Sequence, residues 1–286
     1  MQYVAPETAR AAVALLAKAK GSAHVLAGGS DLLVRMKGGM IEPDLIVDIK
    51  RIKSMQAVKK TASGFSIGAA VSCAELGENK ALRKAWPGVV EAANLIGSKQ
   101  IQGRCTIAGN LCNAGPAADS VPAMVAAAAK AVIQGSRAKR TIPVEQVAVG
   151  PGRTSLKKGE IVEAIMLPAR PPKSGDAYLR FIPRTEMDIA VVSCGISLTL
   201  DAKGVVKEAR VALGAVAPTV LLVAAAAKAL IGSKLEDAAL DKLGEACSAA
   251  CRPINDKRGT IEFRTKVAAV LAKRAAKIAY GRAGGK

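Results

Sequence analysis

Residues 24–37 place a short apolar run, a pair of glycines and the beginning of a helix in immediate succession. The run His24-Val25-Leu26-Ala27 predicts a strand, and Ser30-Asp31-Leu32-Leu33 predicts a helix that begins at Ser30. Gly28 and Gly29 stand between them, where residues without a Cβ let the backbone approach a ligand closely. A strand, a glycine turn and a helix N-terminus in this order are typical of an anion-binding site.

A second stretch of small residues runs from Gly97 to Asp119, with the sequence GSKQIQGRCTIAGNLCNAGPAAD. It predicts a loop longer than most in a compact domain, and such loops commonly carry function. Gly109-Asn110 corresponds to the glycine pair of the first loop. If the two loops converge, their backbone N–H groups can surround one diphosphate.

The first part of the chain predicts two lobes. Residues 1–55 alternate helix and strand, with a helix from Pro6 to about Lys20 and strands at 24–27 and 44–49, which favours a small parallel sheet. Residues 56–70 predict a hairpin, and a helical pattern from Ala74 is broken at Pro87. Further elements are expected as a helix at 121–130 and strands at 131–134, 138–142 and 160–167.

The segment Ala169-Arg170-Pro171-Pro172-Lys173-Ser174-Gly175 has the composition of a linker and predicts a domain boundary. The expected domains are therefore 1–175, with lobes at about 1–55 and 56–175, and 176–286. After the linker, residues 190–200 and 205–213 flank a turn and predict an antiparallel hairpin. Helical patterns follow at 219–231, 235–251 and 260–280, so we expect a small sheet backed by helices.

The residue content excludes several kinds of chemistry. His24 is the only histidine, so a metal site with several histidines is impossible, and a His-based catalytic triad would have to use this one residue. We expect His24 to be structural, with a ligand contact as the alternative. Neither G-x-G-x-x-G nor G-x-x-x-x-G-K-[ST] occurs, so the Rossmann and Walker sites lack their main support.

The cysteines and the apolar runs indicate the compartment. None of the six cysteines forms a C-x-x-C pair, which favours buried free thiols over a disulfide framework or a metal site. The longest apolar runs, such as 219–227, are too short to span a bilayer, and Met1–Ala5 begin no signal sequence. We therefore expect a cytoplasmic protein.

The chain is strongly basic. Its 42 Lys and Arg residues exceed its 23 Asp and Glu residues, which gives a net charge of +19. The basic residues are scattered and no aromatic residues alternate with them, so the pattern favours a basic surface facing acidic partner subunits. A nucleic-acid groove is the alternative.

Four segments together carry a resemblance to a known family: LAGGSDLLVRMK, IGSKQIQGRCTIAGNLCNAGPAADSVPAM, YLRFIPRTEMDIA and CRPINDKRGTIEFRTKVAAVLAKRA. In order and spacing they resemble the FAD-binding medium subunit of the xanthine dehydrogenase and carbon monoxide dehydrogenase family of molybdenum hydroxylases. The resemblance implies an α+β fold: a two-lobed PCMH-type FAD domain, with a small parallel α/β lobe and a larger mixed-sheet lobe. A C-terminal domain with a three-stranded antiparallel sheet and three helices is expected to follow.

The resemblance also implies which residues bind FAD. The two loops would hold the diphosphate, Asp119 would bind the ribityl chain, and Gly97, Val162 and Arg180 would lie at the flavin. Ala108 stands where the family usually has a glycine, and Arg180 where it more often has a lysine. For Asp119 a helix-capping role stays open, and for Tyr178 a core position is as well supported as a contact with the ring. The implied set is Leu26, Ala27, Gly28, Gly29, Ser30, Asp31, Leu32, Gly97, Thr106, Ile107, Ala108, Gly109, Asn110, Asp119, Val162 and Arg180.

The implied function is that of an electron-transfer subunit with FAD on this chain and no catalytic or metal-ligating residue of its own. The molybdenum cofactor would belong to a large subunit and two [2Fe–2S] clusters to a small subunit, as a dimer of heterotrimers without nucleic acid. Electrons would pass from the clusters through FAD to an external acceptor. The alternatives are a free-standing FAD oxidase or reductase, with His24 or Cys105 as covalent flavin ligands, and a basic nucleic-acid-binding protein.

Overall fold

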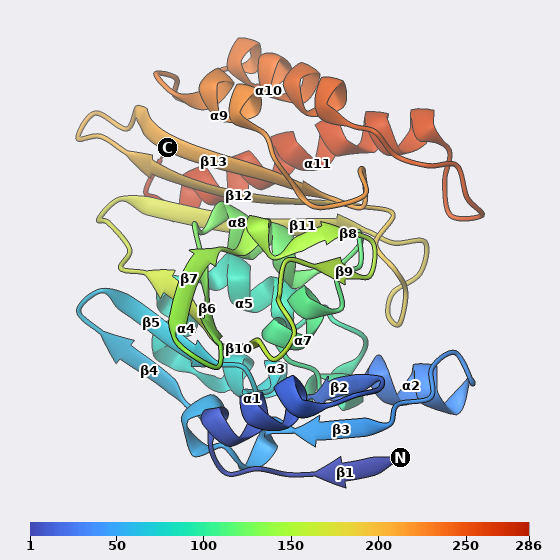
Figure 1. The fold of residues 1–286 in the computed structure, drawn as a ribbon. Helices are drawn as coiled ribbons and strands as arrows, with labels where there is room; N and C mark the ends of the chain where they lie inside the picture. Colours follow the sequence, from blue (N-terminus) through green and yellow to red (C-terminus); the bar gives the residue numbers. More distant parts are fainter. Residues whose placement is uncertain (286) are drawn as a thin grey trace.

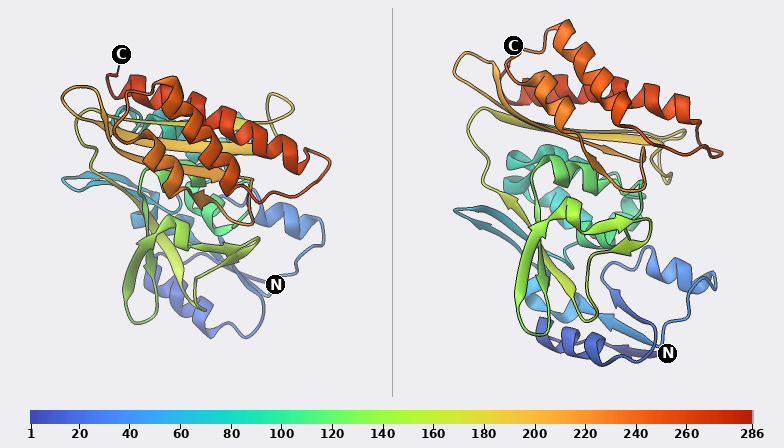
Figure 2. Two further views of the ribbon diagram at one scale, coloured as in Figure 1. Left: turned by 90° about the horizontal axis from the view of Figure 1, so that it is seen from above. Right: turned by 45° about the horizontal axis from the view of Figure 1, so that its top comes forward.

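The computed structural model describes residues 1–285, and it stacks three units along one direction (Figure 1). An N-terminal lobe lies at one end, a middle lobe follows, and a C-terminal unit of sheet and helices lies at the other end. The right-hand view of Figure 2 shows the same order.

The N-terminal lobe is the predicted parallel α/β unit. Its strands are β1 (Gln2–Val4), β2 (Ala23–Leu26) and β3 (Leu45–Asp48), in the order β1-β3-β2 and all parallel. The helices are α1 (Ala9–Lys18) and α2 (Leu32–Lys37). Thr8 begins α1 because its side-chain oxygen accepts a hydrogen bond from the Ala11 N–H at 3.2 Å. The sequence did not predict β1, whose three residues are too few to show a period.

The middle lobe is built on a five-stranded sheet in the order β4-β5-β10-β6-β7. All of its strand pairs are antiparallel, so the prediction of a mixed sheet is wrong in this detail. A small hairpin of β8 and β9 lies beside it. The bounds are β4 (Val58–Thr61), β5 (Gly64–Gly68), β6 (Lys130–Gln134), β7 (Lys139–Pro143), β8 (Ala148–Gly150), β9 (Arg153–Thr154) and β10 (Ile161–Pro168).

Short helices fill the space between this sheet and the C-terminal unit (Figure 1). They are α3 (Cys73–Glu78), α4 (Lys80–Ala85), α5 (Pro87–Ala93), α6 (Lys99–Gln102), α7 (Ile107–Cys112) and α8 (Ser120–Ala126). The stretch 97–119 was predicted to be a loop, but it contains α6 and α7. Each is so short that no apolar period could reveal it in the sequence. Short 3-10 helices complete the region: η1 (Ile49–Arg51), η2 (Lys53–Gln56) and η3 (Val144–Gln146).

The C-terminal unit is an antiparallel sheet in the order β11-β12-β13-β14. The prediction of three strands and three helices holds, and the two residues of β14 add a short fourth strand that replaces the start of the helix expected at 219–231. The bounds are β11 (Ser174–Phe181), β12 (Val192–Leu200), β13 (Val206–Gly214), β14 (Leu221–Leu222), α9 (Ala224–Leu230), α10 (Asp237–Ala250) and α11 (Ile261–Arg282).

Two apolar cores support this arrangement. One extends through the N-terminal and middle lobes, from Val47 of β3 to Met124 of α8. The other lies between the C-terminal sheet and α9–α11. The opposite face of that sheet packs on α5 and α8, so the sheet lies between two helical layers (Figure 2). None of the helices in residues 1–285 combines the length and the apolar character needed to cross a bilayer.

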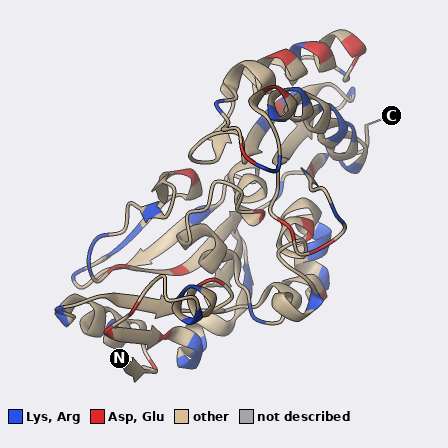
Figure 3. Cartoon of the chain, turned by 90° about the vertical axis from the view of Figure 1, so that its right-hand side faces the viewer, with Lys and Arg blue, Asp and Glu red and all other residues tan. Residues whose placement is uncertain are grey.

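The positive charge is distributed over the whole chain. Figure 3 shows Lys and Arg on all three units of the fold and not on a single patch. Acidic side chains pair with several of them, as Glu160 does with Arg140 at 2.7 Å and Asp241 with Lys273 at 2.6 Å.

Candidate functional site

The first glycine loop connects β2 to α2. Gly29 has a φ of +80°, a conformation that side-chain-bearing residues rarely adopt. Helix α2 begins at Leu32 with Asp31 before it, two residues later than predicted, and the Asp31 side chain makes no capping bond. The backbone of residues 28–31 is therefore an open turn between strand and helix.

The two predicted loops converge. A Cβ built on Gly28 would lie 2.1 Å from the carbonyl oxygen of Arg104 and 2.8 Å from the Cα of Cys105, so the two main chains are in direct contact. The Asn113 Nδ2 donates a hydrogen bond to the Asp31 Oδ1 at 3.1 Å. Only glycine at position 28 permits this approach.

The second loop is fixed by its own side chains. The Thr106 Oγ1 accepts a hydrogen bond from the Gly109 N–H at 2.9 Å and thereby begins α7. The Asn110 Oδ1 accepts hydrogen bonds from the Ser120 N–H at 3.1 Å and the Ser120 Oγ at 2.7 Å, which ties α7 to α8. Ala108 lies in the first turn of α7, where φ is negative, so its methyl group is accommodated in place of the family's glycine.

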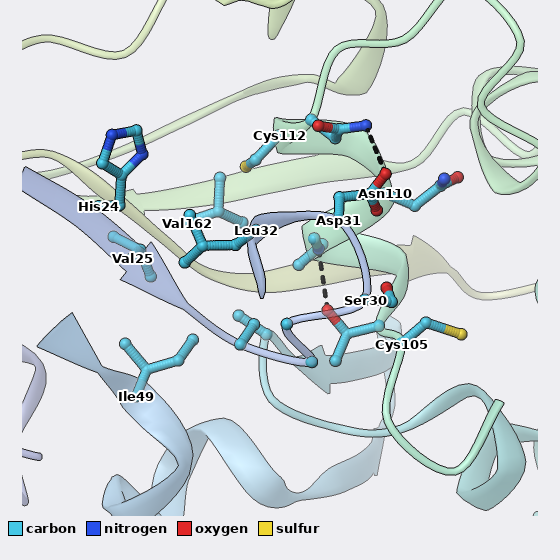
Figure 4. Close-up of a pocket in the computed structure, with 18 of the residues that line it drawn as sticks. His24, Val25, Ser30, Asp31, Leu32, Ile49, Cys105, Asn110, Cys112 and Val162 are labelled. Atoms are coloured by element: carbon cyan, nitrogen blue, oxygen red, sulfur yellow. Dashed lines mark hydrogen bonds between the residues drawn. The ribbon is translucent and has the colours of Figure 1, made fainter. Parts of the chain in front are cut away.

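A pocket of about 240 Å³ opens between the loops. Figure 4 shows Ser30 and Asp31 of the first loop beside Asn110 and Cys105 of the second. Most of the residues predicted to bind a cofactor line this pocket: Ala27, Gly28, Gly29, Ser30, Asp31, Leu32, Thr106, Ala108, Gly109, Asn110 and Val162.

The other predicted residues lie outside it. Leu26 and Ile107 are buried side chains that flank the loops. Gly97 has a φ of +61°, and its carbonyl accepts a hydrogen bond from the Met187 N–H at 3.3 Å. Asp119 and Arg180 lie together at a second location, between α8 and β11.

The donors around the pocket fit a diphosphate. Within residues 1–285, the N–H groups of residues 28–31 donate no hydrogen bond to the protein, and the same holds for Ile107 and Ala108 at the start of α7. Backbone N–H groups of two loops thus remain available on either side of the cavity. Such groups bind phosphate oxygens well, because they carry partial positive charge and are fixed in direction.

Asp119 is part of a buried cluster. Its Oδ2 lies 2.6 Å from the Arg180 Nη1, and its Oδ1 accepts a hydrogen bond from the Tyr178 hydroxyl at 2.9 Å. Burial raises the pKa of Asp119 to about 6, although Arg180 and Tyr178 act in the opposite direction. The side chain makes no capping bond to α8, so the helix-capping alternative for Asp119 is wrong.

Several residues that line the pocket stand outside the implied FAD-binding set. His24 and Arg35 are among them, and burial, followed by the charge of Arg35, lowers the pKa of His24, which keeps the imidazole neutral near pH 7. Asn113 is only three residues beyond Asn110. The sequence did not indicate its contact with Asp31, because the folding of the loop creates that contact. His24 and Cys105 were named only under the alternatives, as a ligand contact and as covalent flavin ligands, and both line the pocket. The lining residues that were missed are Val25, Arg35, Ile49, Ala69, Ile96, Cys112, Asn113, Leu156, Glu160 and Ile161.

No group of three or more His, Cys, Asp or Glu side chains within the described chain is placed to hold a metal ion. Fold and site together define a two-lobed domain with a pocket suited to phosphate groups between its loops, joined to a domain of sheet and helices.

Comparison with known proteins agrees with this class. Residues 1–170 match the family described as "FAD binding domain in molybdopterin dehydrogenase", and residues 177–279 match the "CO dehydrogenase flavoprotein C-terminal domain". The chain is 31% identical to the carbon monoxide dehydrogenase medium chain of Hydrogenophaga pseudoflava over 281 residues, which cover 98% of this chain and 97% of that protein. It is 30% identical to a putative xanthine dehydrogenase FAD-binding subunit of Escherichia coli over 266 residues, 92% of this chain and 91% of that one.

Solved structures show the same fold. Carbon monoxide dehydrogenase from Hydrogenophaga pseudoflava superposes with a TM-score of 0.94 at 32% identity and covers 99% of this chain and 98% of its own. The chain therefore belongs to the FAD-binding medium subunits of the molybdenum hydroxylase family that includes carbon monoxide dehydrogenase and xanthine dehydrogenase. The predicted family and fold class are confirmed.

Proposed function

We propose that the two glycine loops hold the diphosphate of FAD, with Leu26–Leu32 on one side and Thr106–Asn110 on the other. The observation that carries this proposal is their convergence on one pocket with backbone N–H groups free to donate. The loops need no cation for this role, because fixed N–H groups supply the positive end of each dipole.

We propose further that the rest of the cofactor extends toward the boundary between the domains 1–175 and 176–286. Asp119 and Arg180 lie at this boundary, and Gly97 reaches it through its bond to Met187. Asp119 would bind the ribityl hydroxyls, and Arg180, Gly97 and Val162 would contact the flavin. A guanidinium at this place stabilises negative charge that develops on the ring.

Bound FAD would supply the exchange of one and two electrons that links iron–sulfur clusters to an external acceptor. The chain's own contribution is to bind the cofactor, orient it and set its electrostatic environment. We assign no catalytic acid or base to this chain, and the substrate would be oxidised on a partner subunit. His24, the only histidine, lies 3.1 Å from the Ser22 Oγ through its Nε2.

The proposed partners are a large molybdenum-cofactor subunit and a small subunit with two [2Fe–2S] clusters, as a dimer of heterotrimers in the cytoplasm. Two observations support partner contacts. The relatives are named medium chains. Helix α2 and the turn after it bury none of their large apolar side chains: Leu33 is 50%, Val34 62% and Met40 64% exposed. Apolar groups exposed this far are typical of surfaces that another chain covers.

The test is purification of the native complex, followed by acid precipitation. The expected result is a flavin spectrum, co-purification of a large molybdenum and a small iron–sulfur protein, and release of the flavin into the acid supernatant. Flavin that stays with the precipitate would favour the free-standing oxidase, because His24 and Cys105 both line the pocket and could bond it covalently. A colourless protein would refute the proposal.

A further inference from the structure

Cys73 and Cys105 are neighbours in the core of the two lobes, and Cys105 also lines the pocket. Cys73 is the first residue of α3, and its backbone N–H donates to the Cys105 carbonyl at 2.9 Å. Each thiol shifts the pKa of the other, which agrees with side chains that lie near each other. Cys73 is 0% exposed and Cys105 3%, so the pair is enclosed by the core of the two lobes.

The backbone geometry suits a disulfide. The path from the Cys73 Cα through its N–H and the Cys105 carbonyl to the Cys105 Cα is about 7 Å long when fully straight. Because the path bends at the nitrogen and at the carbonyl carbon, the distance between the two Cα atoms is shorter than this. A disulfide requires Cα atoms about 4.4–6.8 Å apart with side chains directed toward each other. The backbone bond holds the two cysteines side by side, and both have free thiols.

Cys105 connects this pair to both glycine loops. It precedes Thr106, which begins α7, and its Cα is one of the atoms that a Cβ on Gly28 would strike. It also lines the pocket, whereas Cys73 lies behind it. A small oxidant therefore reaches the pair from the pocket side, and a cofactor bound there covers that approach.

We propose that Cys73 and Cys105 are a redox modification site: hydrogen peroxide joins them in a reversible disulfide when the pocket is free of FAD, and bound FAD protects them. This inference rests on the proposed placement of FAD for its protection step, but not for the formation of the disulfide.

The chemistry runs through Cys105. Interaction with the Cys73 thiol lowers the pKa of Cys105, and the same interaction raises the pKa of Cys73, so the thiolate forms on Cys105. This thiolate attacks one oxygen of hydrogen peroxide, the O–O bond breaks, and hydroxide leaves a sulfenic acid behind. The Cys73 sulfur then attacks the sulfenic sulfur, the S–O bond breaks, and the second oxygen leaves as water after taking the Cys73 proton. Two thiols lose two electrons and peroxide becomes two waters.

The disulfide acts on the FAD site through Cys105. The disulfide would fix Cys105, whose Cα lies against Gly28, to α3, so that the second loop could no longer adjust to a bound diphosphate. FAD should therefore bind the disulfide form more weakly, and reduction with dithiothreitol should restore its affinity.

The experiment compares the full chain with and without FAD under hydrogen peroxide, followed by alkylation and trypsin. The FAD-free chain should give a cross-link between peptides 61–80 and 105–130. Fragment ions must place the bond at Cys105, because Cys112 lies in the same peptide. With FAD at about ten times its Kd, the cross-link should form about tenfold more slowly, since only the free fraction reacts.

The control thiols are Cys194 and Cys247, which are buried in the C-terminal core and should stay reduced. Cys73→Ser should stop the reaction at a sulfenic acid on Cys105 that dimedone labels. Absence of the Cys73–Cys105 cross-link in the FAD-free wild-type chain overturns the proposed site, and equal rates with and without FAD overturn the protection step. If the chain never binds FAD, the proposed function is refuted. The cross-link in the FAD-free sample still shows whether Cys73 and Cys105 form a disulfide.

Discussion

Asp119 at the start of α8 and Arg180 in β11 form an ion pair of 2.6 Å that joins the FAD-binding domain to the C-terminal domain. Their side chains are only 10% and 5% exposed. Two charges enclosed in this way stabilise each other, and neither can recover water as a partner when the other is lost.

Replacement of one partner should therefore be costly. We expect Asp119→Ala to lower the free energy of unfolding by about 3–5 kcal/mol, because the Arg180 charge stays buried without its partner. The double variant Asp119→Ala/Arg180→Met should be more stable than Asp119→Ala alone, since it removes that charge as well. Denaturation with urea, followed by circular dichroism, measures both values.

The exposed pair of Lys273 and Asp241 is the matched control for this comparison. It has the same 2.6 Å distance, but its side chains are 36% and 66% exposed. Lys273→Ala should change the free energy of unfolding by no more than about 1 kcal/mol. Equal effects of Asp119→Ala and Lys273→Ala would show that the buried pair does not hold the domains together.

Asp119 should also make stability depend on pH in an unusual direction. Its folded pKa is raised by burial to about 6, above the ordinary value of 3.8 that applies to the unfolded chain. Between these values the folded chain binds more protons, so the stability that Asp119 contributes is full below pH 4 and declines as the pH rises through 6. The difference of two units corresponds to about 3 kcal/mol.

The measurement is the free energy of unfolding of the wild-type chain and of Asp119→Asn from pH 4 to 7. The wild-type value should fall relative to the variant across this range, because the amide does not titrate. A wild-type value that instead rises relative to the variant would mean that the ion pair with Arg180 outweighs burial.

The sequence predicted most of the helices and strands in which an apolar pattern repeats over many residues. Strands β10, β12 and β13 and helices α10 and α11 lie within a few residues of their expected positions, because each carries a sustained apolar pattern. Helices α6 and α7 were missed, since four and six residues cannot show a helical period. The two residues of β14 are likewise identified only by their pairing with β13.

The candidate site also has a part that the sequence predicted and a part that it did not. Residues adjacent in the chain, such as Gly28 and Gly29, could be selected from the loop itself. The contact of Gly28 with Arg104 and the bond from Asn113 to Asp31 join distant segments, so no local pattern contains them. The ion pair of Asp119 with Arg180 was not predicted either, because each residue was assigned a separate role beside the cofactor.

Gly28 offers a direct test of the converging loops. We expect Gly28→Ala to lower the affinity for FAD by at least about tenfold, or about 1.4 kcal/mol, because its methyl group would lie 2.1 Å from the Arg104 carbonyl oxygen and force the loops apart. Fluorescence titration of the FAD-free chain measures the Kd. Gly103→Ala is the control, since its Cβ would meet nothing closer than the Gln100 carbonyl oxygen at 3.7 Å and its φ is −67°. It should bind FAD as the wild type does. If Gly28→Ala also retained wild-type affinity, contact between the two loops could not be what shapes the diphosphate site.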